Sequence, residues 1–214
     1  MRTLFLHTLN SNQALFTPLT NEHLPSVEAK HIVKEEFLQQ VVRNGQTSTI
    51  RNTIHKYLIT QLDGGFDIII CTCSTSGPII EAFSHERVLR VDVPLAITAS
   101  QYHNLLAAAP LESTIASTKA LLQRHMPNSL LGLVLIDDAW EHFANGDTPF
   151  FNQTLALELE FALSQNNYDA VVLAQASMPS VIQEYGFSLP LLNSPDTCIE
   201  YLKELIQKLS LSGS

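Results

Sequence analysis

The sequence has no long apolar run and few cysteines. No run approaches the roughly 18 apolar residues that a membrane-spanning helix needs, and the start, MRTLFLHTLN, lacks the long apolar segment and the small-residue cleavage site of a signal peptide. The three cysteines, at 71, 73 and 198, are too few for a disulfide framework, which favours reduced thiols in a reducing compartment. We therefore expect a cytoplasmic protein that does not enter a membrane.

Basic residues are also scarce, and this disfavours nucleic-acid binding. Twelve Lys and Arg stand against 21 Asp and Glu, for a formal charge of −9, and the basic residues are scattered rather than gathered in a stripe. Among the eight glycines, none forms a phosphate-binding GxGxxG or GxxxxGK(S/T) loop. An anionic small molecule stays a candidate ligand, because backbone N–H groups and hydroxyls can supply the donors.

Short apolar runs alternate with segments of helical periodicity along the chain. Runs such as DIIIC at 67–71 and DAVVLA at 169–174 are typical of strands buried on both faces, whereas the segment at 50–62 repeats apolar residues at helical spacing. Alternation of such strands with helices predicts parallel sheets flanked by helices, so the predicted fold class is α/β. The apolar stripes fit a monomer core and a dimer interface equally, so a homodimer stays open.

An internal duplication with an offset of 102 residues runs through the sequence. CSTSG at 73–77 follows one apolar strand, and QASMP at 175–179 follows another 102 positions later. GGFD at 64–67 and NNYD at 166–169 precede the two strands at the same offset. We therefore expect two similar α/β lobes, related by a pseudo-two-fold axis, with an active-site cleft between them.

A terminal helix beginning at Ser194-Pro195-Asp196 looks like a surplus over the repeat. Ser194 is a typical N-cap, and proline is favoured at the first helical position. We expect this helix to belong to the first lobe. The predicted lobes are residues 1–94 with 189–214, and residues 95–188.

Cys73 stands where the first of the paired strands ends and a helix is expected to begin. In parallel α/β sheets ligands bind beyond the carboxyl ends of the strands. A helix start commonly lowers the pKa of a thiol, so we expect Cys73 to be more acidic and more reactive than Cys71 or Cys198. Ser74, Thr75 and Ser76 add hydroxyl donors for a thiolate or a carboxylate. Cys71 lies within the apolar strand and is expected to be a structural core residue.

These motifs resemble those of the aspartate/glutamate/hydantoin racemase superfamily. CSTSG at 73–77 is similar to the first cysteine motif of that family, and VLAQASM at 172–178 lies where the family carries its second cysteine. VLRVDVPLAITA at 88–99 resembles the segment that leads into the second lobe, and LESTIASTKALL resembles the loop and helix that carry a Ser/Thr pair. The resemblance covers nearly the whole chain, including the duplication.

The resemblance implies an enzyme without metal or other cofactor that acts on a small carboxylate, such as an amino acid. Two cysteines of the family face each other, one removing the proton alpha to the carboxylate and the other returning it on the opposite face. Cys73 matches the first cysteine, and Gln175 takes the place of the second, facing Cys73 across the cleft. Positions expected to bind the substrate are Asn10, Ser11, Ser74, Thr75, Ser113 and Thr114, with Ser177 as a further candidate donor.

Gln175 departs from the pattern of the family. A carboxamide neither gives up nor accepts a proton at working pH, so half of a two-cysteine racemisation is missing. Three repairs stay open: one thiol suffices for another reaction, such as an isomerisation or a decarboxylation; Cys71, His7 or Ser177 stands in; or the site only binds. A non-catalytic carboxylate-binding protein and a hydrolase with a cysteine nucleophile are therefore the alternatives to a racemase-like isomerase.

Overall fold

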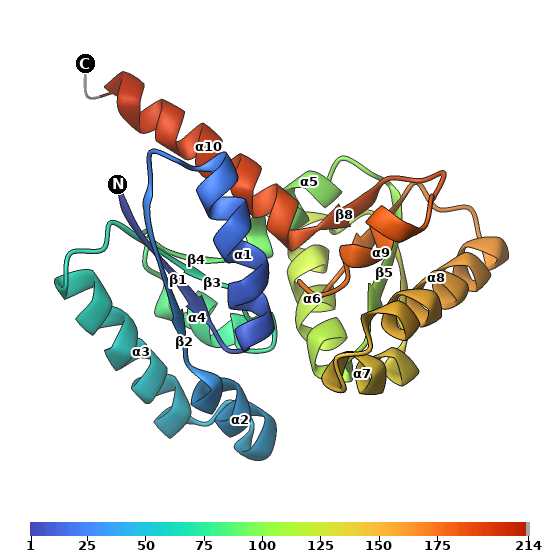
Figure 1. The fold of residues 1–214 in the computed structure, drawn as a ribbon, viewed down its shortest axis with the longest axis horizontal. Helices are drawn as coiled ribbons and strands as arrows, with labels where there is room; N and C mark the ends of the chain where they lie inside the picture. Colours follow the sequence, from blue (N-terminus) through green and yellow to red (C-terminus); the bar gives the residue numbers. More distant parts are fainter. Residues whose placement is uncertain (213–214) are drawn as a thin grey trace. The chain divides into compact units, whose positions relative to one another are not determined.

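The computed structural model describes residues 1–212, and the side chains of these residues except 113, 183 and 209–212. Within this range the chain divides into two compact units. Unit 1 comprises Met1–Val91 with the segment from Cys198 onward, and unit 2 comprises Asp92–Thr197. Figure 1 shows the helices and strands of both units. Among the described helices, none combines the length and the apolar character that crossing a membrane requires.

Unit 1 is built on a parallel sheet of four strands within the described range. Its elements are, in chain order, β1 (Arg2–His7), α1 (Asn10–His23), β2 (Glu28–Val33), α2 (Glu35–Asn44), α3 (Ser48–Asp63), β3 (Ile68–Cys71), α4 (Gly77–Phe83) and β4 (Val88–Arg90). The strand order is β2-β1-β3-β4. The chain therefore steps from β1 out to β2 and returns past β1 to β3, which places α1 on one face of the sheet and α2 with α3 on the other.

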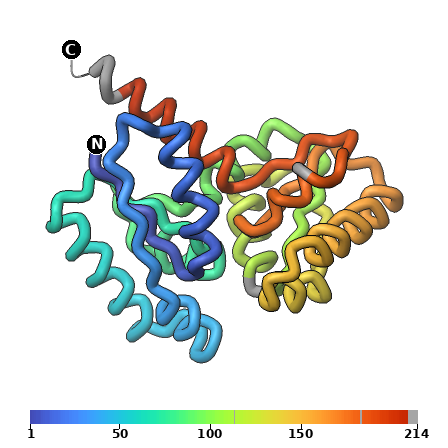
Figure 2. The backbone as a smooth tube through the Cα atoms, in the orientation of Figure 1, coloured from blue at the N-terminus to red at the C-terminus, as the bar shows by residue number. Residues whose placement is uncertain are grey.

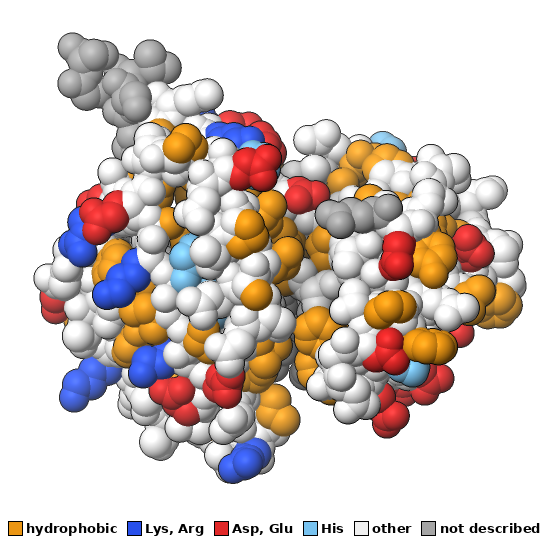
Figure 3. All heavy atoms as spheres, in the orientation of Figure 1, with side chains coloured by type: hydrophobic (Ala, Val, Ile, Leu, Met, Phe, Trp, Pro, Cys, Tyr) orange, Lys and Arg blue, Asp and Glu red, His pale blue; other side chains and the backbone are white. Residues whose placement is uncertain are grey.

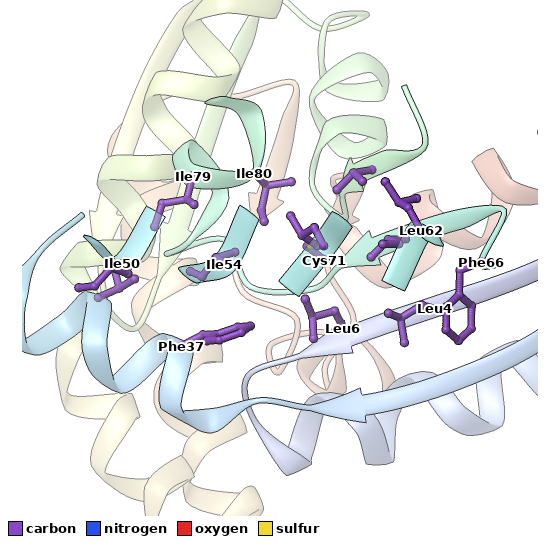
Figure 4. Close-up of a cluster of buried hydrophobic side chains, with 14 residues drawn as sticks. Leu4, Leu6, Phe37, Ile50, Ile54, Leu62, Phe66, Cys71, Ile79 and Ile80 are labelled. Atoms are coloured by element: carbon purple, nitrogen blue, oxygen red, sulfur yellow. The ribbon is translucent and has the colours of Figure 1, made fainter. Parts of the chain in front are cut away.

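A hydrophobic core of unit 1 lies between the sheet and α3. Four isoleucines and leucines of α3 point into it at four-residue spacing, as the helical period of the sequence predicts. Figure 4 shows these side chains meeting those of β1 and β3, with a phenylalanine of α2 at the edge of the cluster. Members of the cluster include Leu4, Leu6, Phe37, Ile50, Ile54, Leu58, Leu62, Ile69, Cys71 and Ile79.

Unit 2 repeats this architecture. Its elements are, in chain order, α5 (Val93–Ala99), β5 (Asn104–Ala109), α6 (Glu112–His125), β6 (Leu130–Leu135), α7 (Asp137–Ala144), α8 (Thr148–Gln165), β7 (Ala170–Leu173), α9 (Ser180–Glu184) and β8 (Leu191–Asn193). The parallel strands take the order β6-β5-β7-β8. Apolar side chains of α5 and α6 cover one face of this sheet, and those of α7, α8 and α9 cover the other.

The duplication predicted from the sequence is confirmed in the strands. β1, β2 and β3 begin and end 102 positions before β5, β6 and β7. The pairing register is also repeated, since Thr3 lies opposite Ile68 and Leu105 lies opposite Ala170. The predicted α/β class, with parallel sheets flanked by helices, is confirmed in both units.

The terminal helix α10 (Ser194–Ser212) has a partner in the repeat that the sequence did not reveal. It follows β8 as α5 follows β4, so the expectation that it is a surplus is wrong. The first lobe was expected to include the chain from 189, but β8 pairs with β7 and holds this segment in unit 2 as far as Thr197. From Cys198 onward the red end of the trace belongs with the blue part that opens the chain (Figure 2).

Gly77, the first residue of α4, lies against a buried arginine. Arg90 at the end of β4 is 3% exposed, and its Nη1 lies 2.8 Å from Oε1 of Glu81. A Cβ on Gly77 would lie 2.3 Å from Cζ of Arg90, closer than two carbon atoms approach without rearrangement. A side chain at this position therefore requires the guanidinium of Arg90 to shift.

Replacing Gly77 by alanine is expected to lower the free energy of unfolding by about 1–3 kcal/mol, the usual cost of overpacking a filled interior. The ion pair with Glu81 restrains Arg90 from moving aside. Urea-induced unfolding measures the effect. The matched control is Gly186→Ala, where nothing lies within 4 Å of the added Cβ, and its effect should stay below about 0.5 kcal/mol. Equally small effects in the two variants would contradict the steric argument.

Candidate active site

The sheet of unit 1 has a topological switch point between β1 and β3. From β1 the chain passes to β2 on one side, and the next strand, β3, lies on the other side. In open α/β sheets ligands bind beyond the carboxyl ends of the strands at such a point. The segments that leave β1 and β3, residues 8–12 and 72–76, are therefore the candidate site of this unit.

The Cys73 turn, defined as residues 72–76, connects β3 to α4. Ser76 Oγ donates to the carbonyl oxygen of Cys73 at 3.2 Å. Gln46, from the connection between α2 and α3, donates from Nε2 to the carbonyl oxygen of Thr75 at 3.3 Å. The turn is therefore closed on itself and held by a neighbouring connection.

The side chains of the Cys73 turn are mostly buried. Cys73 is 9% exposed, Thr72, Thr75 and Ser76 are buried, and Ser74 is half-buried. Ser76 was expected to donate to a thiolate or a carboxylate. In the structure its hydroxyl donates to the carbonyl oxygen of Cys73 instead. Ser74 and Thr75 lie in the predicted place, directly beyond Cys73.

The first turn of α1 contacts the Cys73 turn. Asn12, which is buried, donates from Nδ2 to the carbonyl oxygen of Thr72 at 3.4 Å. Asn10 and Ser11 are exposed in the same helical turn, and Asn10 donates from Nδ2 to Oε1 of Glu35 at 2.5 Å. The direct contact is thus made by Asn12, which the sequence reasoning missed; a polar side chain two residues into a helix carries no signal of burial.

Unit 2 places Gln175 where unit 1 places Cys73. In unit 1 the N–H of Thr72 donates to the carbonyl oxygen of Leu6 on β1 at 3.0 Å. In unit 2 the N–H of Ala174 makes the equivalent bond to the carbonyl oxygen of Ala108 on β5 at 2.9 Å. Gln175 donates from Nε2 to Oγ of Ser177 at 3.1 Å. Its Oε1 is buried and has no hydrogen-bond partner among the residues that the structure describes. The NH2 group of the carboxamide therefore has a partner in its own turn, whereas the oxygen does not.

The turn that carries Gln175 is anchored by α8. Asn152, which is buried, accepts from Oγ of Ser180 at 2.6 Å and donates to Oε2 of Glu184 at 2.5 Å. Ser180 also reaches the carbonyl oxygen of Ser177 at 3.3 Å. These bonds hold the start of α9 and, with it, the segment that follows Gln175.

The remaining predicted residues lie at the start of α6. Thr114 is buried in the first turn of this helix, 102 positions after Asn12. It is therefore the counterpart in unit 2 of Asn12, which contacts the Cys73 turn in unit 1. The side chain of Ser113 lies outside the described residues. Among the described His, Cys, Asp and Glu side chains, none form a group of three that could hold a metal ion.

A pair of histidines lies behind the Cys73 turn. His7 is 0% exposed; its Nδ1 lies 2.9 Å from Oγ1 of Thr72, and its Nε2 lies 2.9 Å from Nδ1 of His31. Burial, assisted by the neighbouring His31, lowers the pKa of His7 to about 3. Burial also lowers the pKa of His31. Both imidazoles are therefore neutral at neutral pH.

The three side chains considered as substitutes for the second cysteine are either hydrogen-bonded or buried in the core. Both ring nitrogens of His7 have partners. Cys71 is 3% exposed in the core cluster, and burial together with Cys73 raises its pKa, which confirms it as a structural cysteine. The hydroxyl of Ser177 is bonded to Gln175.

The fold recurs in solved structures of racemases. The aspartate racemase of Picrophilus torridus matches with a TM-score of 0.74 and 16% identity, over 94% of this chain and 92% of that one. The glutamate racemase of Francisella tularensis, solved with D-glutamate, matches with 0.70 and 15% over 98% and 82% of the two chains. The allantoin racemase of Klebsiella pneumoniae gives 0.65 and 12% over 97% and 88%.

The chain has the fold of the aspartate and glutamate racemases. The resemblance drawn from the sequence is thereby confirmed at the level of the fold. No family model matches the chain, and no curated protein matches it in sequence. Within this racemase fold, Cys73 and Gln175 hold equivalent places in the two repeats.

The neutral state of His7 makes stability depend on pH. In the unfolded chain the pKa of a histidine is about 6.5, whereas burial lowers that of His7 to about 3 in the folded protein. The unfolded chain therefore binds a proton below pH 6.5 that the folded chain does not, and the stability present above pH 6.5 is lost as the pH falls. Below pH 6.5, His7 alone lowers the free energy of unfolding by about 1.4 kcal/mol for each pH unit by which the pH falls.

The variant His7→Phe removes this proton uptake. Between pH 7 and pH 5, its free energy of unfolding should fall by about 2 kcal/mol less than that of the unchanged protein. Urea-induced unfolding at pH 7, 6 and 5 measures the difference. The control His103→Gln, at an exposed histidine before β5, should keep the original slope. Parallel slopes for all three proteins would contradict a buried neutral His7.

Iodoacetamide at neutral pH should label Cys73 before Cys71 and Cys198. Cys73 lies in a turn and is 9% exposed, whereas Cys71 and Cys198 are 3% and 1% exposed, and burial raises the pKa of Cys71. The thiolate is the species that reacts, so a buried thiol of raised pKa reacts slowly. Tandem mass spectrometry of a labelling time course distinguishes the three sites. Faster labelling of Cys198 would mark Cys73 as a structural cysteine.

Proposed function

We propose that the protein is a cofactor-independent isomerase that acts at the carbon alpha to the carboxylate of a small amino acid or related acid, with Cys73 as its catalytic thiol. The observation that carries the proposal is the position of Cys73. It stands beyond the carboxyl end of β3, at the switch point of a fold shared with aspartate and glutamate racemases. A positioned thiol can take and return a proton in this setting.

The formal negative charge of the protein is concentrated in unit 2. Unit 2 holds 2 of the 12 Lys and Arg and 11 of the 21 Asp and Glu, so the formal charge of −9 lies on this unit, while unit 1 carries ten of each sign. In the view of Figure 3 the blue basic side chains lie over unit 1. Hydroxyl, amide and backbone N–H donors are neutral and suit an anion in such surroundings. The proposed donors are Asn10, Ser11, Ser74, Thr75, Ser113, Thr114 and Ser177.

A single thiol limits the chemistry that follows. The Cys73 thiolate takes the alpha proton, and the electron pair of the broken C–H bond is delocalised into the carboxylate. When the thiol returns a proton, it does so on the face from which the proton was taken. Gln175 can hold the substrate through its amide, but it has no proton to deliver to the other face. The site thus exchanges the alpha hydrogen with configuration retained, or serves a reaction in which one face suffices, such as a decarboxylation.

A carboxylate-binding protein without chemistry is the second candidate. Gln175 favours it, because an amide in place of an acid suits a site that holds its ligand unchanged. Its buried Oε1, which lacks a partner among the described residues, is an acceptor suited to the ammonium group of an amino acid.

Deuterated buffer separates these possibilities. With both enantiomers of aspartate, glutamate and other small amino acids as probes, the protein should introduce alpha-deuterium into one enantiomer without forming its mirror image. Cys73→Ser should slow this exchange by about 100-fold or more, the usual contribution of a general base. Rapid racemisation by the unchanged protein would show that another residue supplies the second acid. Protection of Cys73 from iodoacetamide by an amino acid that undergoes no exchange would favour the binding protein.

Replacing Gln175 by cysteine provides the complementary gain of function. The thiol can protonate the face that Gln175 cannot, so Gln175→Cys should form the mirror-image enantiomer from the acid that the unchanged protein only exchanges. Gln175→Ser is the matched control, since its hydroxyl is far less acidic than a thiol and should leave the product with its original configuration. Polarimetry or chiral chromatography measures the outcome. Exchange in Gln175→Cys that still proceeds entirely with retention would contradict the place assigned to Gln175.

A further inference from the structure

Four polar side chains of unit 1 form one continuous hydrogen-bond chain that ends at the Cys73 turn. Thr72 Oγ1 lies 2.9 Å from Nδ1 of His7, and Nε2 of His7 lies 2.9 Å from Nδ1 of His31. Nε2 of His31 lies 3.1 Å from Oγ1 of Thr20, which donates to the carbonyl oxygen of Thr17 at 3.0 Å. This polar chain therefore joins α1, β2, β1 and the residue before Cys73.

One complete arrangement of the protons follows when the hydroxyl of Thr20 donates to the carbonyl oxygen of Thr17. Because the hydroxyl proton of Thr20 goes to a carbonyl, Thr20 accepts from His31, whose Nε2 must carry the hydrogen. A neutral His31 then accepts at Nδ1, so His7 donates from Nε2. The bare Nδ1 of His7 accepts in turn from the hydroxyl of Thr72. Every polar atom has a partner while both rings stay neutral.

A second complete arrangement has every bond reversed. Thr72 Oγ1 also lies 3.4 Å from the carbonyl oxygen of Leu6, to which it can turn its proton. His7 would then donate from Nδ1 to Thr72, His31 from Nδ1 to His7, and Thr20 to His31. The first arrangement ends on a 3.0 Å bond to a carbonyl and the second on a 3.4 Å bond, so the first is favoured.

Unit 2 shows that the α/β unit does not need this polar chain. The positions 102 residues after Thr72, His7, His31 and Thr20 hold Ala174, Ala109, Leu133 and Leu122. The strand register around them is the same in both units. The buried imidazole of His7 costs stability below pH 6.5, as described above, whereas an apolar residue does not. The polar chain is therefore particular to the repeat that carries the cysteine.

Aromatic rings keep the histidine pair in one orientation. The ring of Phe5 lies 5.0 Å from that of His31, and the ring of Phe16 lies 5.9 Å from that of His7, between centroids. The planes of the two imidazoles differ by 3°. Phe5, Phe16 and His7 are buried, so water has little access to the bond between the rings.

We propose that His7 is a positioning residue for Cys73 that acts through Thr72. The proposal rests on the proposed function of Cys73 as the reacting thiol. All three polar groups of Thr72 are held: its N–H by Leu6, its carbonyl by Asn12 and its hydroxyl by His7. The residue before Cys73 is thus fixed in three directions, and the polar chain extends this hold to α1 and β2.

The tautomers of the two histidines test whether the polar chain acts as a unit. Nitrogen-15 NMR of the imidazoles should show hydrogen on Nε2 of both His7 and His31. In Thr20→Val the N–H of His31 loses its acceptor, and an unpaired N–H costs more than an unpaired acceptor. Both rings should then change to the Nδ1-protonated form, although His7 does not contact Thr20. Thr20→Ser should keep the original tautomers; an unchanged His7 in Thr20→Val would contradict a coupled chain.

The reactivity of Cys73 tests the positioning role. Thr72→Val and His7→Phe each remove the hydrogen bond between Thr72 and His7, so the Cys73 turn should open more often. Iodoacetamide should therefore label Cys73 faster, on the order of tenfold. Cys71 and Cys198 should stay unlabelled, which excludes global unfolding as the cause. Thr72→Ser restores the hydroxyl and should restore the slow rate. The matched control is Thr3→Val on β1, a buried threonine whose hydroxyl has no hydrogen-bond partner among the described side chains and backbone.

Labelling rates that are equal in Thr72→Val, Thr72→Ser and the unchanged protein would overturn the proposal. Neither readout needs an active enzyme, so the two hypotheses can fail separately. If no amino acid undergoes alpha-exchange but the labelling rates differ as expected, the proposed function fails and the positioning of Cys73 by His7 stands. If exchange occurs and is about equally fast in Thr72→Val, the proposed function stands and the positioning role fails.

Discussion

The pairing of β3 with β1 is the interaction on which the rest of unit 1 depends. It sets Leu6 opposite Cys71, and successive residues of a strand point to opposite faces of the sheet. Cys71 therefore enters the core against α3, Thr72 turns to the face of α1 and meets His7, and Cys73 begins the turn that leaves the sheet. A slip of one residue would exchange these faces and set a cysteine where the histidine needs a hydroxyl.

The two units illustrate how one backbone can hold two different sets of side chains at equivalent positions. Both have the same register and the same contact from the strand end to its neighbour, yet unit 1 places imidazoles and hydroxyls where unit 2 places alanine and leucine. The asymmetry also appears in the formal charge, which unit 2 carries. Since the backbone fold tolerates both sets of side chains, the polar side chains of unit 1 are not a requirement of the fold.

Much of the fold can be predicted from the sequence because buried parallel strands are short apolar runs and the repeat has a constant offset. DIIIC and DAVVLA mark β3 and β7, and the turns that follow them mark the candidate site. The partner of α10 could not be predicted, because α5 is a seven-residue helix and α10 a 19-residue one, with no shared motif. Hydrogen bonds between distant residues were also hidden: His7, His31 and Thr72 come from three segments, and nothing in their spacing indicates contact. Asn12 was missed for the same reason.

The central claim is that the Cys73 turn binds the carboxylate of a small acid. A crystal structure grown with saturating aspartate, and another with glutamate, tests it most directly. We expect the carboxylate or the alpha carbon of one of these acids next to Cys73, with hydrogen bonds from Ser74, Thr75 or the backbone of the turn. An acid bound only elsewhere on the protein, with the Cys73 turn empty in both crystals, would contradict it.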